Sequence, residues 1–423
     1  MITIKKTAYL AIILTLLFTA NASYAASDDT RYFVKSTSGW WKKSFGIRHN
    51  FDDGFTADLT DFQLRLAKVF GVEVEPVKKL NILPDLSQAL PILSATKSQL
   101  QNRGSSISQP DSLNSGEIGT ITSGKFKAKR AKPTEQIPWG IKKVYNNSFL
   151  SETSGGSGVN VAVLDTGVLK THPDLKNRIK ECKDFSGPLS VADGKCDDKN
   201  GHGTHVAGII AADGGSDGLG LYGMAPEANL FVYKVCSNNG TCWADDIAVA
   251  LRTAADDGVN IVNMSLGSDN PSQLITDATD YVVSKNVLIV AAAGNDGPYT
   301  GSIDFPGADA DVVSVGAVDK NLLIPDWSSR GINLTTKPYV VEAQDMELAA
   351  PGLNIESTWK DGSYAILSGT SMASPHVAGL AAKLWKKDSL NPASDTRDIL
   401  HKLTTDLLPN GDDDDSGFGF PHL

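Results

Sequence analysis

Apolar runs alternate with amphipathic segments over the larger, C-terminal part of the chain. The runs cover residues 159–164, 230–235, 259–266, 287–293 and 312–318, and their nearly continuous apolar character predicts strands buried on both faces. Apolar residues at helical spacing predict helices over residues 202–212, 244–257, 274–285, 371–386 and 394–403. This alternation predicts an α/β domain with a parallel central sheet and helices on both faces, within residues 133–423. Functional residues of such domains gather beyond the carboxyl ends of the strands.

The N-terminal third follows other patterns. Residues 1–26 have a lysine pair, a short apolar stretch and small residues at the end, which predicts a secretory signal peptide. An uncleaved anchor is the alternative, although the apolar stretch is short for a bilayer span. Residues 27–83 predict a small α+β unit, with strands at 32–34 and 72–77 and a capped helix at 60–71. Residues 84–132 are rich in Ser, Gln, Gly and Lys and predict a flexible linker.

The net charge of the chain limits the kinds of macromolecule that it is expected to bind. The 423 residues carry a formal net charge of -10, with a pI of about 5.2, which argues against a nucleic-acid partner. No segment after the signal peptide is apolar enough to predict a membrane span. We therefore expect a secreted, extracellular protein, with the periplasm or the cell surface as alternatives. The acidic run at residues 412–415 is expected to be solvated, with calcium binding as the alternative.

Export also decides how the four cysteines are interpreted. In an oxidising compartment, two disulfides are favoured over a metal site, because no pair has C-x-x-C spacing. Proximity in the sequence suggests that Cys182 pairs with Cys196 and Cys236 with Cys242. The sequence alone leaves the other pairings open.

Three residue types suited to nucleophilic catalysis lie at the ends of predicted elements. Asp165 follows a buried strand, His202 begins a helix between two glycines, and Ser371 begins another helix among small residues. We expect Pro375 to fall in the first turn of that last helix, where a missing N–H has no cost. A serine hydroxyl needs a base to remove its proton, and the base needs a carboxylate to hold its tautomer. An N-cap role is the alternative for Ser371.

Four motifs resemble those of the subtilisin-like (subtilase) serine proteases. They are VLDTG at 163–167, NGHGTHVAG at 200–208, AAAGNDG at 291–297 and SGTSMASPHVAG at 368–379. The resemblance implies that Asp165 orients His202, that His202 acts as general base and acid, and that Ser371 is the nucleophile. It also implies that Asn295 donates a hydrogen bond to the oxyanion.

The resemblance further implies that a substrate peptide binds as an added strand between two edges of the cleft. The residues that match these edges and the adjoining pocket wall are Ser265, Leu266, Gly267, Gly240, Thr241, Ala293 and Gly294. Asp304 matches the floor of the primary specificity pocket, where a carboxylate would favour Lys or Arg at P1, the residue before the cut bond. A solvated loop aspartate is the alternative.

Maturation and cofactor follow from the same resemblance. Residues 27–83 match an inhibitory propeptide in order and size, and the basic segment at 129–132 suggests self-cleavage near the end of the linker. Asp174 and, less clearly, Asp217 match a structural calcium site. We expect a monomer that acts on proteins and peptides.

Two other classes remain open. One is a catalytically silent, peptide-binding relative, which the four intact residues argue against. The other is an esterase of the α/β-hydrolase type, whose G-x-S-x-G elbow is missing around Ser371.

Overall fold

The computed structural model describes residues 30–83, 131–187, 191–333, 340–407 and 411–423. The predicted signal peptide and nearly all of the predicted linker lie outside these residues. No helix in the described part of the chain combines the length and apolar character needed to cross a bilayer.

An eight-stranded sheet forms the centre of the molecule, with the order β14-β13-β12-β10-β5-β8-β6-β7. All neighbouring strands are parallel except β6 and β7. The strands are β5 (Asn160–Asp165), β6 (Ile179–Asp184), β7 (Ala192–Asp193), β8 (Asn229–Lys234), β10 (Ile261–Met264), β12 (Leu288–Ala292), β13 (Val312–Val318) and β14 (Leu348–Pro351). The expected parallel sheet is confirmed.

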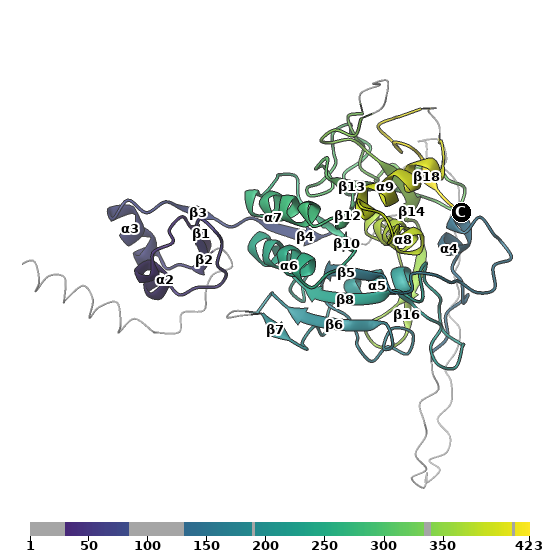
Figure 1. The fold of residues 1–423 in the computed structure, drawn as a ribbon, viewed down its shortest axis with the longest axis horizontal. Coiled ribbons are helices and arrows are strands. Elements are labelled where there is room, and N and C mark those ends of the chain that lie inside the picture. The colour runs from purple at the N-terminus through teal and green to yellow at the C-terminus, as the bar shows by residue number, and fades with distance from the viewer. Residues whose placement is uncertain (1–29, 84–130, 188–190, 334–339, 408–410) are drawn as a thin grey trace, which may run out of the picture.

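Side chains along each strand alternate between the two faces of the sheet. Because the strands are apolar at successive positions, both faces are apolar, and helices cover both. Val161 and Val163 belong to an apolar cluster with α5 (His202–Ala211) and α8 (Thr370–Leu384). Ala162 and Leu164 face the other way, into a cluster with α6 (Ala244–Asp256) and α7 (Gln273–Ser284). Figure 1 shows α6 and α7 together on one side and α5 and α8 on the other.

Residues 30–83 form a small α+β unit beside the ends of α6 and α7 (Figure 1, purple). A sheet of order β2-β1-β3 packs on α2 and α3 around a separate apolar core. The elements are β1 (Arg31–Val34), α2 (Gly39–Phe45), β2 (Phe55–Asp58), α3 (Asp61–Val69) and β3 (Val74–Pro76). A reciprocal pair of hydrogen bonds between Thr60 and Gln63 caps α3 where the sequence predicts a helix start.

This unit contacts the first turn of α6 through a buried ionic cluster. Asp245 and Asp246 are fully buried, and one Arg31 nitrogen donates to a carboxylate oxygen of each at 2.9 Å. Arg48 and His49 add contacts to Asp246 at 3.3 and 2.8 Å. Because buried carboxylates need compensating charge, the two parts of the chain depend on each other here.

Several expectations about local structure need correction. Helix α8 begins at Thr370, so Pro375 lies beyond its first turn and removes a donor from the helix interior. The acidic run at residues 412–415 is not simply solvated, since Asp414 accepts a bond from Asn333 and Asp415 pairs with Arg330. Disulfides join Cys182 to Cys196 and Cys236 to Cys242, the pairing expected from proximity.

Candidate active site

Asp165 and His202 meet at the carboxyl end of the sheet. Asp165 is the last residue of β5, and His202 is the first residue of α5. Both Asp165 carboxylate oxygens lie 2.9 Å from His202 Nδ1, and both side chains are buried. An ionised carboxylate only accepts, so Nδ1 carries the proton and Nε2 is the atom able to take one.

A buried aspartate that the sequence analysis did not single out shapes the segment before His202. Asp198 Oδ1 accepts from the Asn200 and Gly201 backbone and from Thr166, next to Asp165. Its second oxygen accepts two bonds from Thr204, on the first turn of α5. Asp198 therefore ties the Asp165 strand end to the His202 helix start. The feature of the sequence that could have drawn attention to Asp198 is its position four residues before His202.

Ser371 is the second residue of α8, and its surroundings follow from Pro375. Proline has no N–H, so the carbonyl of Ser371 lacks its normal partner four residues on. Ser265 Oγ donates to that carbonyl at 2.9 Å, and Ser371 Oγ lies 3.3 Å from the Ser265 carbonyl oxygen. Ser265, expected from the sequence at the peptide-binding edge, thus also anchors the start of α8.

Asn295 is held in one orientation by the residue before Ser371. The backbone N–H and the hydroxyl of Thr370 both donate to Asn295 Oδ1 at 3.0 Å. Because the amide oxygen faces Thr370, the amide nitrogen points the other way. Thr370 was not among the predicted site residues, although its place beside Ser371 was visible.

A strand of the N-terminal unit occupies the expected peptide-binding edges. β4 (Lys79–Ile82) lies between β11 (Leu266–Gly267) and β9 (Thr241–Trp243) in an antiparallel sheet. The Ile82 N–H also donates to the Gly240 carbonyl at 2.9 Å. The segments at 240–241 and 265–267 therefore flank an extended chain in the way that the sequence analysis expects for a substrate.

Asp304 lies behind these edges and is 4% exposed, so the solvated-loop alternative is wrong. A Cβ placed on Gly267 or Gly294 would meet an Asp304 oxygen at 2.8 or 3.0 Å. Gly294 directly follows Ala293, and both are buried. Burial, followed by the charges of Asp296 and Asp269, raises the pKa of Asp304 to about 7.

The two expected calcium ligands differ in their surroundings. Asp174 is fully buried, and its Oδ2 accepts from the Leu221 N–H and the Tyr364 hydroxyl. Asp217 lies on the exposed part of the neighbouring loop and accepts from the Leu219 N–H at 3.2 Å. Gln136 binds the Gly218 and Gly220 carbonyls of that loop. Asp174 thus bonds directly to this loop, whose carbonyl oxygens are ligands of the kind that a hard cation takes, whereas the exposed Asp217 fits less well.

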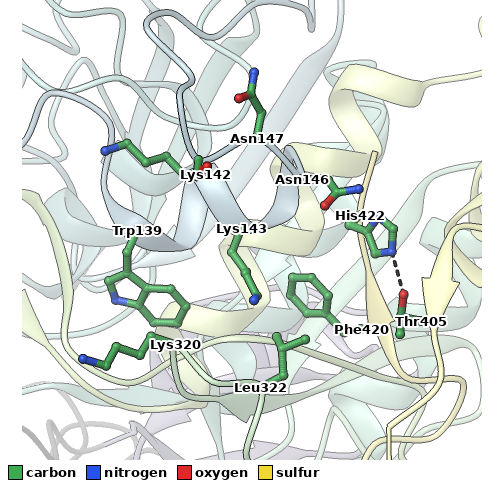
Figure 2. Close-up of a pocket in the computed structure, with 11 residues that line it drawn as sticks. Trp139, Lys142, Lys143, Asn146, Asn147, Lys320, Leu322, Thr405, Phe420 and His422 are labelled. Carbon is green, nitrogen blue, oxygen red and sulfur yellow. Dashed lines mark hydrogen bonds between the residues drawn. The ribbon is translucent and has the colours of Figure 1, made fainter.

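A separate cavity of about 460 Å³ lies beside α4 (Trp139–Val144) and the C-terminal segment. Lys142, Lys143 and Lys320 line it, together with the rings of Trp139 and Phe420 (Figure 2). His422 bonds to Thr405 at its edge. The lining includes neither Ser371 nor His202, so this cavity is not the catalytic cleft.

Comparisons with known proteins agree with this geometry. Residues 156–419 match the model of the subtilase family, Peptidase_S8. "Subtilisin" of Bacillus sp. (strain TA39) is 42% identical over 400 residues, which cover 90% of this chain and 86% of that protein. "Subtilisin Savinase" of Lederbergia lenta is 40% identical over 275 residues, or 64% of this chain and 93% of that protein.

Solved structures give the same result. "Sphericase" is 48% identical with a TM-score of 0.67, covering 70% of this chain and 100% of its own. "S41 Psychrophilic Protease" is 49% identical with a TM-score of 0.66, covering 69% and 99%. The family match excludes the α/β-hydrolase alternative, and the chain belongs to the subtilase family, as a subtilisin-type serine endopeptidase.

Proposed function

We propose that Asp165, His202 and Ser371 form the catalytic triad of this endopeptidase. His202 Nε2 takes the proton of Ser371 Oγ as the hydroxyl attacks the peptide carbonyl, and later gives it to the leaving amine. The amide of Asn295 and the N–H of Ser371 donate to the oxyanion. Water then hydrolyses the acyl-enzyme. The observation that carries the proposal is the 2.9 Å contact of both Asp165 oxygens with His202 Nδ1.

A fluorophosphonate probe tests the triad. The mature enzyme is expected to be labelled at Ser371 and to lose all peptidase activity as labelling proceeds. Ser371→Ala should abolish labelling and lower kcat by roughly 10⁶, as loss of the nucleophile does in subtilisin. Ser374→Ala is the matched control, since Ser374 lies one turn away and donates to Asn263. Undiminished labelling of Ser371→Ala would reject the assignment, and an unlabelled wild-type enzyme would support the silent relative.

Residues 27–83 act in this proposal as an inhibitory propeptide of a secreted, monomeric enzyme that processes itself. Support comes from β4, which fills the peptide-binding edges in the manner of a bound strand. Buried Leu83 follows this strand, while the basic segment at 129–132 lies farther along the chain. Two positions of different chemistry are thus available for cleavage.

Asp304 gives the enzyme a preference for Lys or Arg at P1. Its burial behind Gly267 and Gly294 supports this role, because a carboxylate inside a narrow site favours a cationic side chain over an apolar one.

A structural calcium ion is proposed at Asp174 and the carbonyl oxygens of the neighbouring loop. When bound, the ion would neutralise the buried carboxylate and stiffen the loop. Chelation should lower the melting temperature of the Ser371→Ala protein, and added Ca²⁺ should restore it. Asp174→Asn should melt at the same temperature with and without chelator. A Ser371→Ala protein with Asp174 intact whose melting temperature does not change on chelation would contradict this proposal.

A further inference from the structure

Three carboxyl groups converge on the side of the peptide-binding cleft that β11 forms. Carboxylate oxygens of Asp269, Asp296 and Asp304 all lie within 4.8 Å of one another. They come from three separate places in the chain: the segment after β11, the turn after β12, and the segment before β13. Asp269 and Asp296 are exposed, whereas Asp304 is buried.

Within the described part of the chain, Asp304 has no partner that balances its charge. Among the described residues, its carboxylate makes no hydrogen bond and no ion pair, although its backbone bonds to Ala293 and Ala308. Arg330, on a segment whose backbone bonds to Ser302, directs its guanidinium to Asp415 and to the carbonyl oxygens of Ser328 and Pro325. A buried acid with only acidic neighbours is costly to ionise, unless a cation arrives from outside.

The three carboxyl groups lie where a cationic side chain of a bound peptide can reach them. Asp304 lies against Gly267, and Gly267 pairs with Asn81 of the strand that fills the cleft. It also lies against Gly294, which precedes Asn295 and bonds to the Thr370 hydroxyl. The cluster is therefore within side-chain reach of a peptide bound in the cleft, close to the residues that handle the scissile bond.

We propose that Asp269, Asp296 and Asp304 form one proton-sharing site that binds the guanidinium or ammonium group of the substrate P1 residue and releases a proton on binding. The proposal rests on the proposed protease function and extends the role given to Asp304 alone. In the empty site, Asp304 is a neutral acid below about pH 7. When a cationic side chain enters, the Asp304 proton leaves to water and the three carboxylates share the positive charge.

Selectivity then depends on pH. Burial and the charges of Asp296 and Asp269 raise the pKa of Asp304 to about 7, and burial and Asp269 also raise the pKa of Asp296. Below pH 7 the buried Asp304 is neutral, so the innermost part of the site accepts an uncharged side chain. Above pH 7 Asp304 becomes anionic, so kcat/KM rises for substrates with a cationic P1 side chain and not for those with an uncharged one. Preference for Arg must increase as the pH rises.

A pair of substrates that differ only in charge tests this. Two otherwise identical peptide anilides carry arginine or its neutral isostere citrulline at P1, and kcat/KM is measured for both between pH 5.5 and 9.5. Ionisation of His202 affects both substrates equally, so it cancels in the Arg-to-citrulline ratio. We expect the ratio to rise at least tenfold with a midpoint near pH 7.

Substitutions distinguish a site shared by three carboxylates from a site that consists of Asp304 alone. Asp304→Asn should give a low ratio that does not change with pH. Asp269→Asn and Asp296→Asn, both at exposed positions that tolerate substitution, should each lower the ratio several-fold above pH 8 and move its midpoint to lower pH. Asp388→Asn, at an exposed position beyond the C-terminal end of α8, removes the same charge and should leave the ratio unchanged.

Each other outcome overturns the inference in a recognisable way. A ratio that stays flat in the wild-type enzyme rejects the site, while hydrolysis of both substrates would leave the protease function intact. A midpoint unaffected by Asp269→Asn and Asp296→Asn rejects the shared site in favour of Asp304 alone. A ratio that responds to chelator or added Ca²⁺ at constant pH shows a metal site instead. Absence of both hydrolysis and fluorophosphonate labelling would reject the protease function itself.

Discussion

At the scale of single residues, the most informative contact is the one that turns the Asn295 amide. Two donors from Thr370 hold its oxygen, and this leaves the amide nitrogen as the group that faces away from them. In the proposed oxyanion role, a flexible asparagine would have to be ordered during the reaction, whereas one already oriented would stabilise the transition state without that cost.

We therefore expect Thr370→Val to reduce kcat about tenfold with little change in KM, because it removes one of two donors to Asn295 and leaves the backbone donor. Thr370→Ser keeps the hydroxyl and should remain close to the wild type. Asn295→Ala alone should lower kcat by about 10²–10³, as loss of this donor does in subtilisin. Steady-state kinetics on all three variants and on the Thr370→Val, Asn295→Ala double variant provides the measurement.

In the double variant, Thr370→Val should cause no further loss, since there is no amide left to orient. Full additivity of the two effects would show that Thr370 acts by another route.

The sequence analysis predicted a site at Asp165, His202, Asn295 and Ser371, because each lies in a long motif next to a strongly apolar or periodic segment. It did not identify Asp198 or Thr370 as positioning residues. Their roles depend on backbone N–H groups and on side chains brought close by folding, and a sequence pattern contains neither.

At the scale of elements, the central strands and the long helices were predictable, because burial on both faces leaves a continuous apolar run. β4 was missed. It has only four residues, Lys79–Ile82, with alternating polarity, and its hydrogen-bond partners lie more than 150 residues away. β14 was also missed, because four residues are too few to show a periodic pattern of apolar and polar positions.

A buried ion pair joins β14 to α9 (Pro392–Lys402) across the end of the sheet. Glu347, next to β14, accepts two bonds from Arg397, including one at 2.7 Å, and a contact from His401 at 2.6 Å. Burial alone would raise the pKa of Glu347, but the charge and hydrogen bonds of Arg397 and the bond from His401 lower it to about 2.

Arg397→Ala is expected to lower the free energy of unfolding by roughly 3 kcal/mol, because it leaves the Glu347 charge buried with less compensation. Urea unfolding of the inactive Ser371→Ala protein, which avoids self-digestion, gives the measurement. Arg252→Ala is the control, since that guanidinium lies over Tyr281 at the surface and should contribute less than about 1 kcal/mol.

The same pair sets a pH dependence with a definite sign. A folded-state pKa below the unfolded value means that the stabilisation is complete above about pH 4.5 and disappears as the pH falls towards 2. The stability difference between Arg397→Ala and its parent should therefore shrink on acidification. A difference that stays constant from pH 7 to pH 3 would contradict this account.

At the scale of the whole molecule, the N-terminal unit is held by charge as well as by its strand. The partners of the ionic cluster, Arg31 and Asp245, are 214 residues apart in the sequence. No local pattern relates two such residues, so the cluster could not be predicted, although the unit itself could.

Separation of this unit from the catalytic domain should depend on that cluster. In the Ser371→Ala background, a specific protease site placed within residues 84–130 converts the chain into a noncovalent complex. Asp246→Ala should then raise the dissociation constant roughly 30-fold or more, because it removes the carboxylate that bonds to His49 and that lies closest to Arg48, both of them buried.

Size-exclusion chromatography over a dilution series would measure this change. Glu73→Ala is the matched control, because Glu73 forms an exposed ion pair with Lys35 inside the unit, and it should leave the constant within about twofold. Equal dissociation constants for Asp246→Ala and its parent would show that the strand alone holds the complex.

The two apolar clusters of the central sheet are covered unequally by the N-terminal unit. Phe33, Val77 and Leu80 of that unit belong to the cluster with α6 and α7, whereas the cluster with α5 and α8 contains none of its residues. Loss of the N-terminal unit would therefore uncover apolar surface only on the α6 and α7 side of the sheet. The side that holds α5 and α8, on which His202 and Ser371 lie, would keep its apolar cover, so the proposed removal of this unit would leave the packing around these two residues intact.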